Sequence, residues 1–479
     1  MADPFARLDA TAQAELLRRR EVGPTELVEA AIARLERLNP SLNAVVHPAL
    51  ERARRRVAAG VPAGPLAGVP TLMKDIGGLE AGEPCHAGMR VLRDARWTER
   101  VDAYFTQKVV QAGLVSLGRT STPELALLPT TEPEAYGPTR NPWNLNHSAG
   151  GSSGGAAAAV AAGIVPVAHA SDGGGSIRGP ASMCGLVGLK PTRGRCSFGP
   201  TLGERWIGFS CEFFVTRSVR DTALLLDLVA GPMPGDPYTA PPPPAPWTTA
   251  LDGPGRPLRV GVMRIAPRAT ALHPEALTAV DRTAQALAAL GHVVEESHPE
   301  ALDDPGSVAA YVTVVSSAVA RALDAIGEKV GRVLESSDVE PLTWALAENG
   351  RRVTAAQLLA TIEFVHAFGR RLASWWESGF DLLLTATQAA PPPEIGYITS
   401  TREEPFRAFL RAAPYGVCTL PFNMSGQPAI SLPVHLTADN LPVGVQLVAP
   451  FGREDLLIGV ARQLEDALPW RDHLPPLHA

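Results

Sequence analysis

Two glycine- and serine-rich segments hold the residues best suited to chemistry in this 479-residue chain. Residues 150–155 carry Ser152 and Ser153 between glycine pairs, and residues 172–178 place Ser176 after three glycines. Because glycine has no Cβ, several backbone N–H groups can converge on one point beside Ser176. This pattern predicts that Ser176 attacks an acyl carbon while backbone amides hold the negative charge that develops on its oxygen.

Lys74 is the candidate for the group that takes the proton of Ser176. No histidine has a motif-like neighbourhood and no GxSxG turn is present, so a Ser-His-Asp triad has little support. Lys74 ends the apolar stretch that begins at Val69, and burial would lower its pKa enough to keep it neutral. A lysine at such a place is more often an exposed charge at the end of a strand, and that interpretation stays open here.

The glycine-rich segments have two other interpretations. A phosphate-binding loop would need the pattern GxxxxGK[ST], which neither segment has. A flexible linker does not fit either, because the apolar run at residues 156–170 follows directly and must be buried as a helix and a strand.

Composition excludes several classes of protein. A net charge of −6 and a pI near 6.0 argue against a nucleic-acid partner or an anionic membrane surface. The apolar stretch 154–170 is too short and too weakly hydrophobic to cross a bilayer. Five cysteines without a CxxC pair and eleven histidines without metal-site spacing predict reduced thiols, a cytoplasmic location, no metal and no cofactor.

The elements that must position these residues follow from periodicity and from turn signals. Helices are expected at 9–20, 24–38, 102–112, 177–184, 274–290 and 454–468, with more helices between 304 and 378. Strands are expected at 69–75, 114–118, 258–265, 381–385, 429–434 and 443–448. The proline run 241–246 is interpreted as an extended surface connector.

This order predicts an α/β fold with a large mixed β-sheet sandwiched between helices. We expect a single domain over residues 1–479, with the catalytic core at about 62–220 and a helical insertion that lines the substrate cleft at about 305–378.

Taken together, the motifs resemble those of the amidase signature family over almost the whole chain. Lys74, the GGSSGG segment and the DGGGSIR segment occur in the family's order. The resemblance continues at residues 185–194 (GLVGLKPTRG), 217–221 (RSVRD), 421–428 (PFNMSGQP) and 442–446 (PVGVQ). It implies the amidase-signature fold and a serine hydrolase that cleaves amide C–N bonds.

The resemblance also implies a role for each residue. Ser176 would be the acyl-forming nucleophile, Ser152 the bridging serine on a cis peptide bond, and Lys74 the base. The oxyanion donors would be the backbone N–H groups of Gly173, Gly174, Gly175 and Ser176. Hydrogen bonds and ion pairing by Ser153, Asp172 and Arg178 would support the two loops.

The substrate is less closely specified than the bond. The stretches 131–135, 139–145 and 467–470 resemble amidases of the nylon-oligomer type, which implies neutral small or oligomeric amides. The alternatives are a hydrolase of the urethanase or aryl acylamidase type, a glutamine amidotransferase subunit, and a non-catalytic subunit on the same fold. The last would be expected to lack Lys74, Ser152 or Ser176, and all three are present. The expected partner is a small-molecule amide, and a homodimer is left open.

Aromatic residues near the catalytic loops predict an apolar cleft. In the family, such stretches wall the acyl site, and only a few charged residues stand among them: Glu204, Arg205 and Glu212. An apolar groove would favour neutral aliphatic or aromatic amides over glutamine. The aromatic residues could equally be core; they are Trp143, Trp206, Phe209, Phe213 and Phe214.

Overall fold

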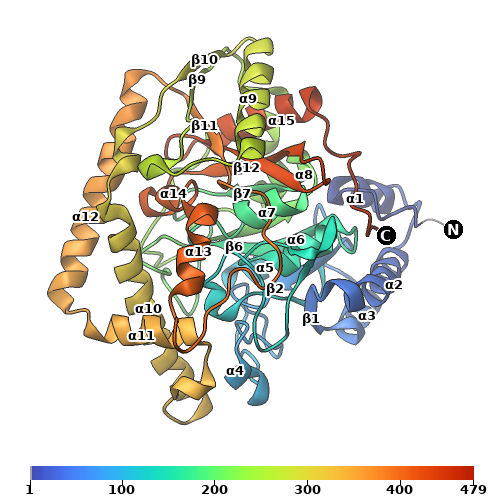
Figure 1. The fold of residues 1–479 in the computed structure, drawn as a ribbon. Helices are drawn as coiled ribbons and strands as arrows, with labels where there is room; N and C mark the ends of the chain where they lie inside the picture. The colour runs from blue at the N-terminus through green and yellow to red at the C-terminus, as the bar shows by residue number, and fades with distance from the viewer. Residues whose placement is uncertain (1–2) are drawn as a thin grey trace.

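One eleven-stranded sheet runs through the molecule (Figure 1). The structure is a computed structural model that describes residues 3–479. Across the sheet the strands are β1 (Val45–Pro48), β3 (Val115–Thr120), β2 (Pro70–Lys74), β6 (Val167–Asp172), β8 (Cys211–Thr216), β7 (Val187–Lys190), β12 (Ala429–Leu436), β13 (Pro442–Val448), β11 (Leu382–Ala386), β9 (Arg259–Val262) and β10 (Val293–Glu296).

The sheet is mixed, as predicted. β2 pairs in parallel with β3 and β6, and β9 pairs in parallel with β10 and β11. Between these parallel parts, β6, β8, β7, β12, β13 and β11 pair antiparallel in turn. Every residue of β2, β8, β11 and β13 is buried, as expected for strands covered on both faces.

Helices cover the sheet, and α6 (Gly154–Ala161) and α7 (Arg178–Cys184) lie at its centre (Figure 1). Both helices begin directly after a serine-containing loop, so packing against the strands also fixes those loops. The other helices outside the 305–378 segment are α1 (Ala10–Arg18), α2 (Pro24–Leu42), α3 (Leu50–Ala58), α4 (Arg90–Asp94), α5 (Tyr104–Gln111), α8 (Val219–Val229), α9 (Pro274–Ala289), α13 (Arg407–Gly416), α14 (Leu420–Ser425) and α15 (Glu454–Ala467).

Helices α10 (Gly306–Val330), α11 (Pro341–Arg352) and α12 (Ala355–Ser374) occupy the segment expected to be helical. They stand along one side of the molecule, on the left in Figure 1, opposite α1, α2 and α3. By length and hydropathy α10 could cross a membrane, but it packs against α11 and α12, and 44% of its most apolar window is buried. A core helix passes the same test.

Strands β7 and β8, which lie in the middle of the sheet, were not predicted from the sequence. β8 pairs with β6 over its whole length, from Val167 opposite Thr216 to Asp172 opposite Cys211. Phe213 and Phe214 of this strand were candidates for either the cleft wall or the core, and all six residues of β8 are buried. An apolar run of this length gives no sign by itself of whether it faces a cavity or a core.

Candidate active site

Lys74 ends β2 beneath the two loops that carry the serines, and it has no exposed surface. Its Nζ lies 2.7 Å from Ser152 Oγ, 2.8 Å from Ser153 Oγ and 3.0 Å from Ser171 Oγ. The interpretation of Lys74 as an exposed charge is therefore wrong. Sequence analysis did not identify Ser171, which precedes the second motif by one residue.

Burial sets the protonation state of this amine. Desolvation lowers the pKa of Lys74 to about 7, while the negative charges of Asp172 and Glu212 act in the opposite direction. A neutral amine has two N–H donors and one lone pair, so among three hydroxyl groups it can donate two hydrogen bonds and accept one. Ser152, the nearest hydroxyl, can donate the accepted one. Lys74 is thus placed to withdraw a proton from Ser152 at neutral pH.

The loop before α6 holds both serines of the first motif. The peptide bond between Gly151 and Ser152 is cis, as the family resemblance implied. Ser153 Oγ lies 3.3 Å from the backbone carbonyl of Ser171 and can donate to it. This contact links the first motif to the end of β6, where the second motif begins.

Asp172 and Arg178 form an ion pair that closes the second motif. Arg178 Nη2 lies 2.9 Å from Asp172 Oδ1, and neither side chain is exposed. Asp172 also accepts from the backbone N–H of Ile177 at 3.0 Å and from Asn423 Nδ2 at 2.9 Å. Arg178 holds the pKa of Asp172 below its usual range in spite of burial. A buried pair with this many hydrogen bonds fixes the loop that carries Ser176.

The backbone amides of this loop differ in what they contact. The N–H of Gly175 donates to Asp172 Oδ1 at 2.7 Å, which corrects the prediction that it would hold an oxyanion. The N–H groups of Gly173, Gly174 and Ser176 donate to no acceptor within residues 3–479. Gly175 has a φ of +133°, and a Cβ there would lie 2.3 Å from Thr419 Oγ1, so only glycine fits.

Ser176 lies where two cavities meet. One cavity, of about 210 Å³, extends from Gly174 and Ser176 towards α13, and the other, of about 580 Å³, passes Ser152 and extends towards α10. Ser176 Oγ makes no hydrogen bond within the part of the chain that the structure describes. An acyl group could thus reach Ser176 from one cavity while the leaving group occupies the other.

Most of the aromatic residues expected in the cleft belong to the core instead. Trp206 lines both cavities. The other four are buried and line neither: Trp143, Phe209, Phe213 and Phe214. Aromatic and charged residues also line the cavities from helices that the sequence analysis did not place individually. They include Tyr311 and Lys329 on α10 and Phe409 on α13.

His169 is the histidine that lies beside Lys74, and it is not placed to act on the serines. Its Nδ1 accepts a hydrogen bond from the backbone N–H of Lys74 at 3.2 Å. Burial lowers its pKa well below the ordinary value, so it is neutral. Within residues 3–479, no group of three or more His, Cys, Asp or Glu side chains could hold a metal ion.

Two further residues support the loop of Ser176. Thr419 Oγ1 donates to the carbonyl of Gly174 at 2.6 Å, and Asn423 Oδ1 accepts from Arg178 Nη2 at 2.6 Å. Asn423 lies in the PFNMSGQP motif, which sequence analysis noted without assigning it a role. Thr419 carried no such signal, because its contact depends on how α14 packs against the loop.

Comparisons with known proteins identify the family of the chain. The family model described as Amidase matches residues 26–458. A 6-aminohexanoate-cyclic-dimer hydrolase of Paenarthrobacter ureafaciens is 45% identical over 478 residues, which is 98% of this chain and 96% of that protein.

Solved structures of related enzymes have the same fold. A 6-aminohexanoate cyclic dimer hydrolase matches with a TM-score of 0.96 at 44% identity and covers all of both chains. A bacterial aryl acylamidase matches with a TM-score of 0.86 at 29% identity, over 98% of this chain and 99% of the other. The likeness to nylon-oligomer amidases is confirmed, and this chain belongs to the amidase signature family, whose members hydrolyse amide C–N bonds.

Proposed function

We propose that this amidase cleaves its substrate through an acyl-enzyme, with Ser176 as nucleophile, Ser152 as proton relay and Lys74 as base. The observation that carries the proposal is the contact of 2.7 Å between Lys74 Nζ and Ser152 Oγ, at an amine whose pKa burial lowers to about 7. A neutral lysine with a hydroxyl in reach is a competent general base at neutral pH.

In the first half of the reaction, Ser176 passes its proton to Ser152 as Ser152 passes its own to Lys74. Ser176 Oγ bonds to the amide carbon, and the free N–H groups of Gly173, Gly174 and Ser176 bind the oxyanion. The C–N bond then breaks as the proton returns through Ser152 to the leaving amine. Water repeats the sequence on the ester and releases the acid, and every step is a proton or acyl transfer that needs no metal or cofactor.

We propose amides of the 6-aminohexanoate oligomer type as substrates. The name of the 45% identical relative supports this assignment, together with two cavities that give room on both sides of the scissile bond. Anilides or carbamates, as in enzymes of the aryl acylamidase or urethanase type, are the second candidate. The cavity towards α13, lined by Tyr311, Phe409 and Tyr415, favours that candidate because it suits an aromatic ring.

A glutamine amidotransferase subunit would need a partner and other substrates. The test is release of free amine by the purified chain alone, without ATP or tRNA. The panel is 6-aminohexanoate cyclic dimer, its linear dimer, an acyl anilide, a carbamate and glutamine. The proposal is supported if the dimers have the highest kcat/KM of the panel, whereas preference for glutamine contradicts it.

A cytoplasmic location and the absence of a nucleic-acid or membrane partner stay predictions.

A further inference from the structure

The larger cavity at Ser176 combines apolar walls with an unusual set of charges. Leu79, Leu125, Val319 and Ile326 are among its apolar lining residues. Charged side chains also line it: Glu99, Glu204, Arg205, Arg321 and Lys329. A charge in an apolar cavity is costly unless something pairs with it, so the partner of each one is informative.

Three of these charges have a partner at close range, and a fourth lies mostly in solvent. Lys329 Nζ donates to Glu99 Oε1 at 3.1 Å, and Glu204 Oε2 accepts from the backbone N–H of Gly208 at 2.6 Å. The side chain of Arg321 is 67% exposed and lies 3.7 Å from Glu328. Solvent and these partners satisfy all four residues.

Arg205 is different. Its guanidinium donates no hydrogen bond to any residue within 3–479, and its Nε is buried without an acceptor. The side chain is half-buried, and its Cζ lies 5.8 Å from the centroid of the Phe198 ring. A guanidinium with five N–H donors in a partly desolvated place would ordinarily bind an acceptor oxygen.

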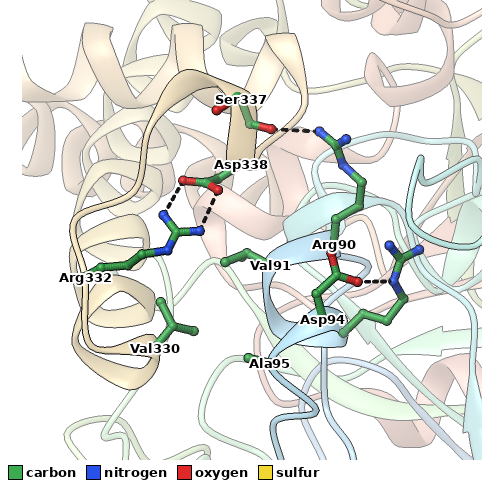
Figure 2. Close-up of a pocket in the computed structure, with 9 residues that line it drawn as sticks. Arg90, Val91, Asp94, Ala95, Val330, Arg332, Ser337 and Asp338 are labelled. Atoms are coloured by element: carbon green, nitrogen blue, oxygen red, sulfur yellow. Dashed lines mark hydrogen bonds and ion pairs between the residues drawn. The ribbon is translucent and has the colours of Figure 1, made fainter.

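A second cavity shows the ordinary arrangement. The cavity of about 360 Å³ between α4 and the end of α10 also holds arginines (Figure 2). There Arg332 Nη1 and Nη2 each donate to Asp338 at 2.7 Å, and Arg90 donates to the carbonyl of Ser337 at 3.1 Å. Each arginine of that cavity donates to at least one acceptor of the protein, although the Nε of Arg90 is also buried without one, whereas the guanidinium of Arg205 donates to none among residues 3–479.

The backbone holds Arg205 close to the reacting groups. Its neighbour Trp206 packs so tightly on the loop of Ser176 that a Cβ on Gly173 would lie 2.8 Å from the indole ring. Trp206 and Ile207 both adopt left-handed φ values, +56° and +50°, which is costly for a bulky or β-branched residue. Arg193 Nε secures the turn by donating to the carbonyl of Gly208 at 2.7 Å. This strained and fixed segment positions the side chain of Arg205 in the lining of the larger cavity at Ser176.

Glu212 is the buried acid that a purely structural account would assign to Arg205. Burial raises the pKa of Glu212, and the charge of Arg205 acts in the opposite direction, so the two side chains interact at a distance. They form no ion pair within 4.0 Å, and the oxygens of Glu212 instead lie against the backbone N–H of Gly78 and near His169. The hydrogen-bonding capacity of Arg205 therefore stays open towards the cavity.

We propose that Arg205 is a specificity-determining residue that donates hydrogen bonds to a second acceptor oxygen of the substrate, away from the scissile carbonyl. This inference rests on the proposed function. The oxygen is a second amide carbonyl or a terminal carboxylate, and both occur in oligoamides of ω-amino acids. It differs from the expectation of an apolar groove with few charges, because an amide with such an oxygen gains contacts that a plain alkyl amide cannot make.

Binding to an inactive enzyme tests this directly. Titration calorimetry compares Ser176→Ala with Ser176→Ala/Arg205→Met for three probes of matched length. The probes are 6-acetamidohexanoate, its N-methylamide and N-hexylacetamide, which carry a carboxylate, a second amide and neither. Loss of the guanidinium should weaken binding of at least one oxygen-bearing probe about tenfold or more and change N-hexylacetamide less than twofold.

The pattern of losses identifies the oxygen. A larger loss for 6-acetamidohexanoate assigns the site to a carboxylate, and a loss at least as large for the N-methylamide assigns it to a second amide. Arg332→Met, at a paired arginine in the cavity of Figure 2, is the matched control and should leave all three affinities within twofold. Equal losses for all three probes, no loss, or no measurable binding of the oxygen-bearing probes would overturn the proposal.

Steady-state kinetics separate this role from an electrostatic one. In the active enzyme, Arg205→Met should raise KM for the oxygen-bearing substrate while kcat for N-hexylacetamide stays within threefold. If Arg205 only tuned Lys74, Arg205→Met would instead shift the pH profile of all substrates, and Arg205→Lys would restore it. Should the wild type bind the probes but hydrolyse no amide, the proposed function fails while the assignment of Arg205 stands.

Discussion

The buried side of the active site and the side that faces the cavities differ in how their polar groups are satisfied. On the buried side, Lys74 has three hydroxyl neighbours and the Asp172–Arg178 pair is hydrogen-bonded throughout. On the cavity side, the hydroxyl of Ser176, three backbone amides and the guanidinium of Arg205 have no hydrogen-bond partner among residues 3–479. Groups of the scaffold thus have hydrogen-bond partners within the fold, whereas groups proposed to bind substrate are held rigid and left unpaired.

The largest effect should come from the open side. Ser176→Ala removes the attacking atom and nothing that the fold uses, so turnover should fall by about 10³- to 10⁶-fold with an unchanged unfolding temperature. Amine release and thermal unfolding measure the two quantities. A variant within tenfold of wild type would remove Ser176 from the mechanism.

On the buried side, Arg178→Met should act on stability first. It leaves the carboxylate of Asp172 buried without its cation, which costs about 3–5 kcal/mol in the free energy of unfolding. Urea denaturation measures this cost. The control is Arg256→Met, which breaks an ion pair with Asp381 at an arginine that is 56% exposed and should cost about 1 kcal/mol or less. If both variants lowered the free energy of unfolding equally, the buried ion pair would contribute no more to stability than the exposed one.

The pH dependence of the reaction rate reports the protonation state of Lys74. Only neutral Lys74 can accept a proton, and its pKa is lowered to about 7. The rate should therefore fall about tenfold per pH unit below pH 7 and level off above it. A profile of kcat/KM from pH 5 to 10 checks this. A limb that rises only near pH 10 would show that Lys74 keeps its ordinary pKa and is not the base.

Ser153→Ala should have a smaller effect. Ser153 Oγ lies 2.8 Å from Lys74 Nζ, but Ser152 and Ser171 still hold the amine after its removal. One lost hydrogen bond of about 0.5–1.5 kcal/mol predicts a decrease in kcat of about tenfold or less. The matched variant is Ser152→Ala, which interrupts the relay and should approach the loss seen for Ser176→Ala. If Ser153→Ala lowered kcat as much as Ser152→Ala does, Ser153 would belong to the proton relay.

Prolonged treatment with EDTA should have no effect on the rate. The chemistry proposed here uses backbone donors for the oxyanion and a lysine for the proton, so no step depends on a metal ion. Amine release before and after dialysis against the chelator measures this. Loss of activity that added zinc restores would overturn the scheme.

Much of the fold was predictable because the spacing of apolar residues in the sequence follows the periods of helices and strands. Helices such as α9 and α15, and strands such as β2 and β13, lie within a few residues of their expected ends. The central strand β8 was not predicted, and the sequence left open whether Phe213 and Phe214 belong to the core or to the cleft. Its apolar residues look the same in sequence whether they meet a neighbouring strand or a substrate.

The motifs of the chain were enough to predict the family, the class of bond and the candidates Lys74, Ser152 and Ser176, because local motifs carry the groups that the chemistry needs. Which polar groups already have partners became visible only in the folded molecule. The N–H of Gly175 donates to Asp172, the pKa of Lys74 depends on complete burial, and the Nε of Arg205 has no acceptor among residues 3–479. Desolvation and hydrogen-bond satisfaction depend on residues far apart in the chain, so they come into existence only when the chain folds.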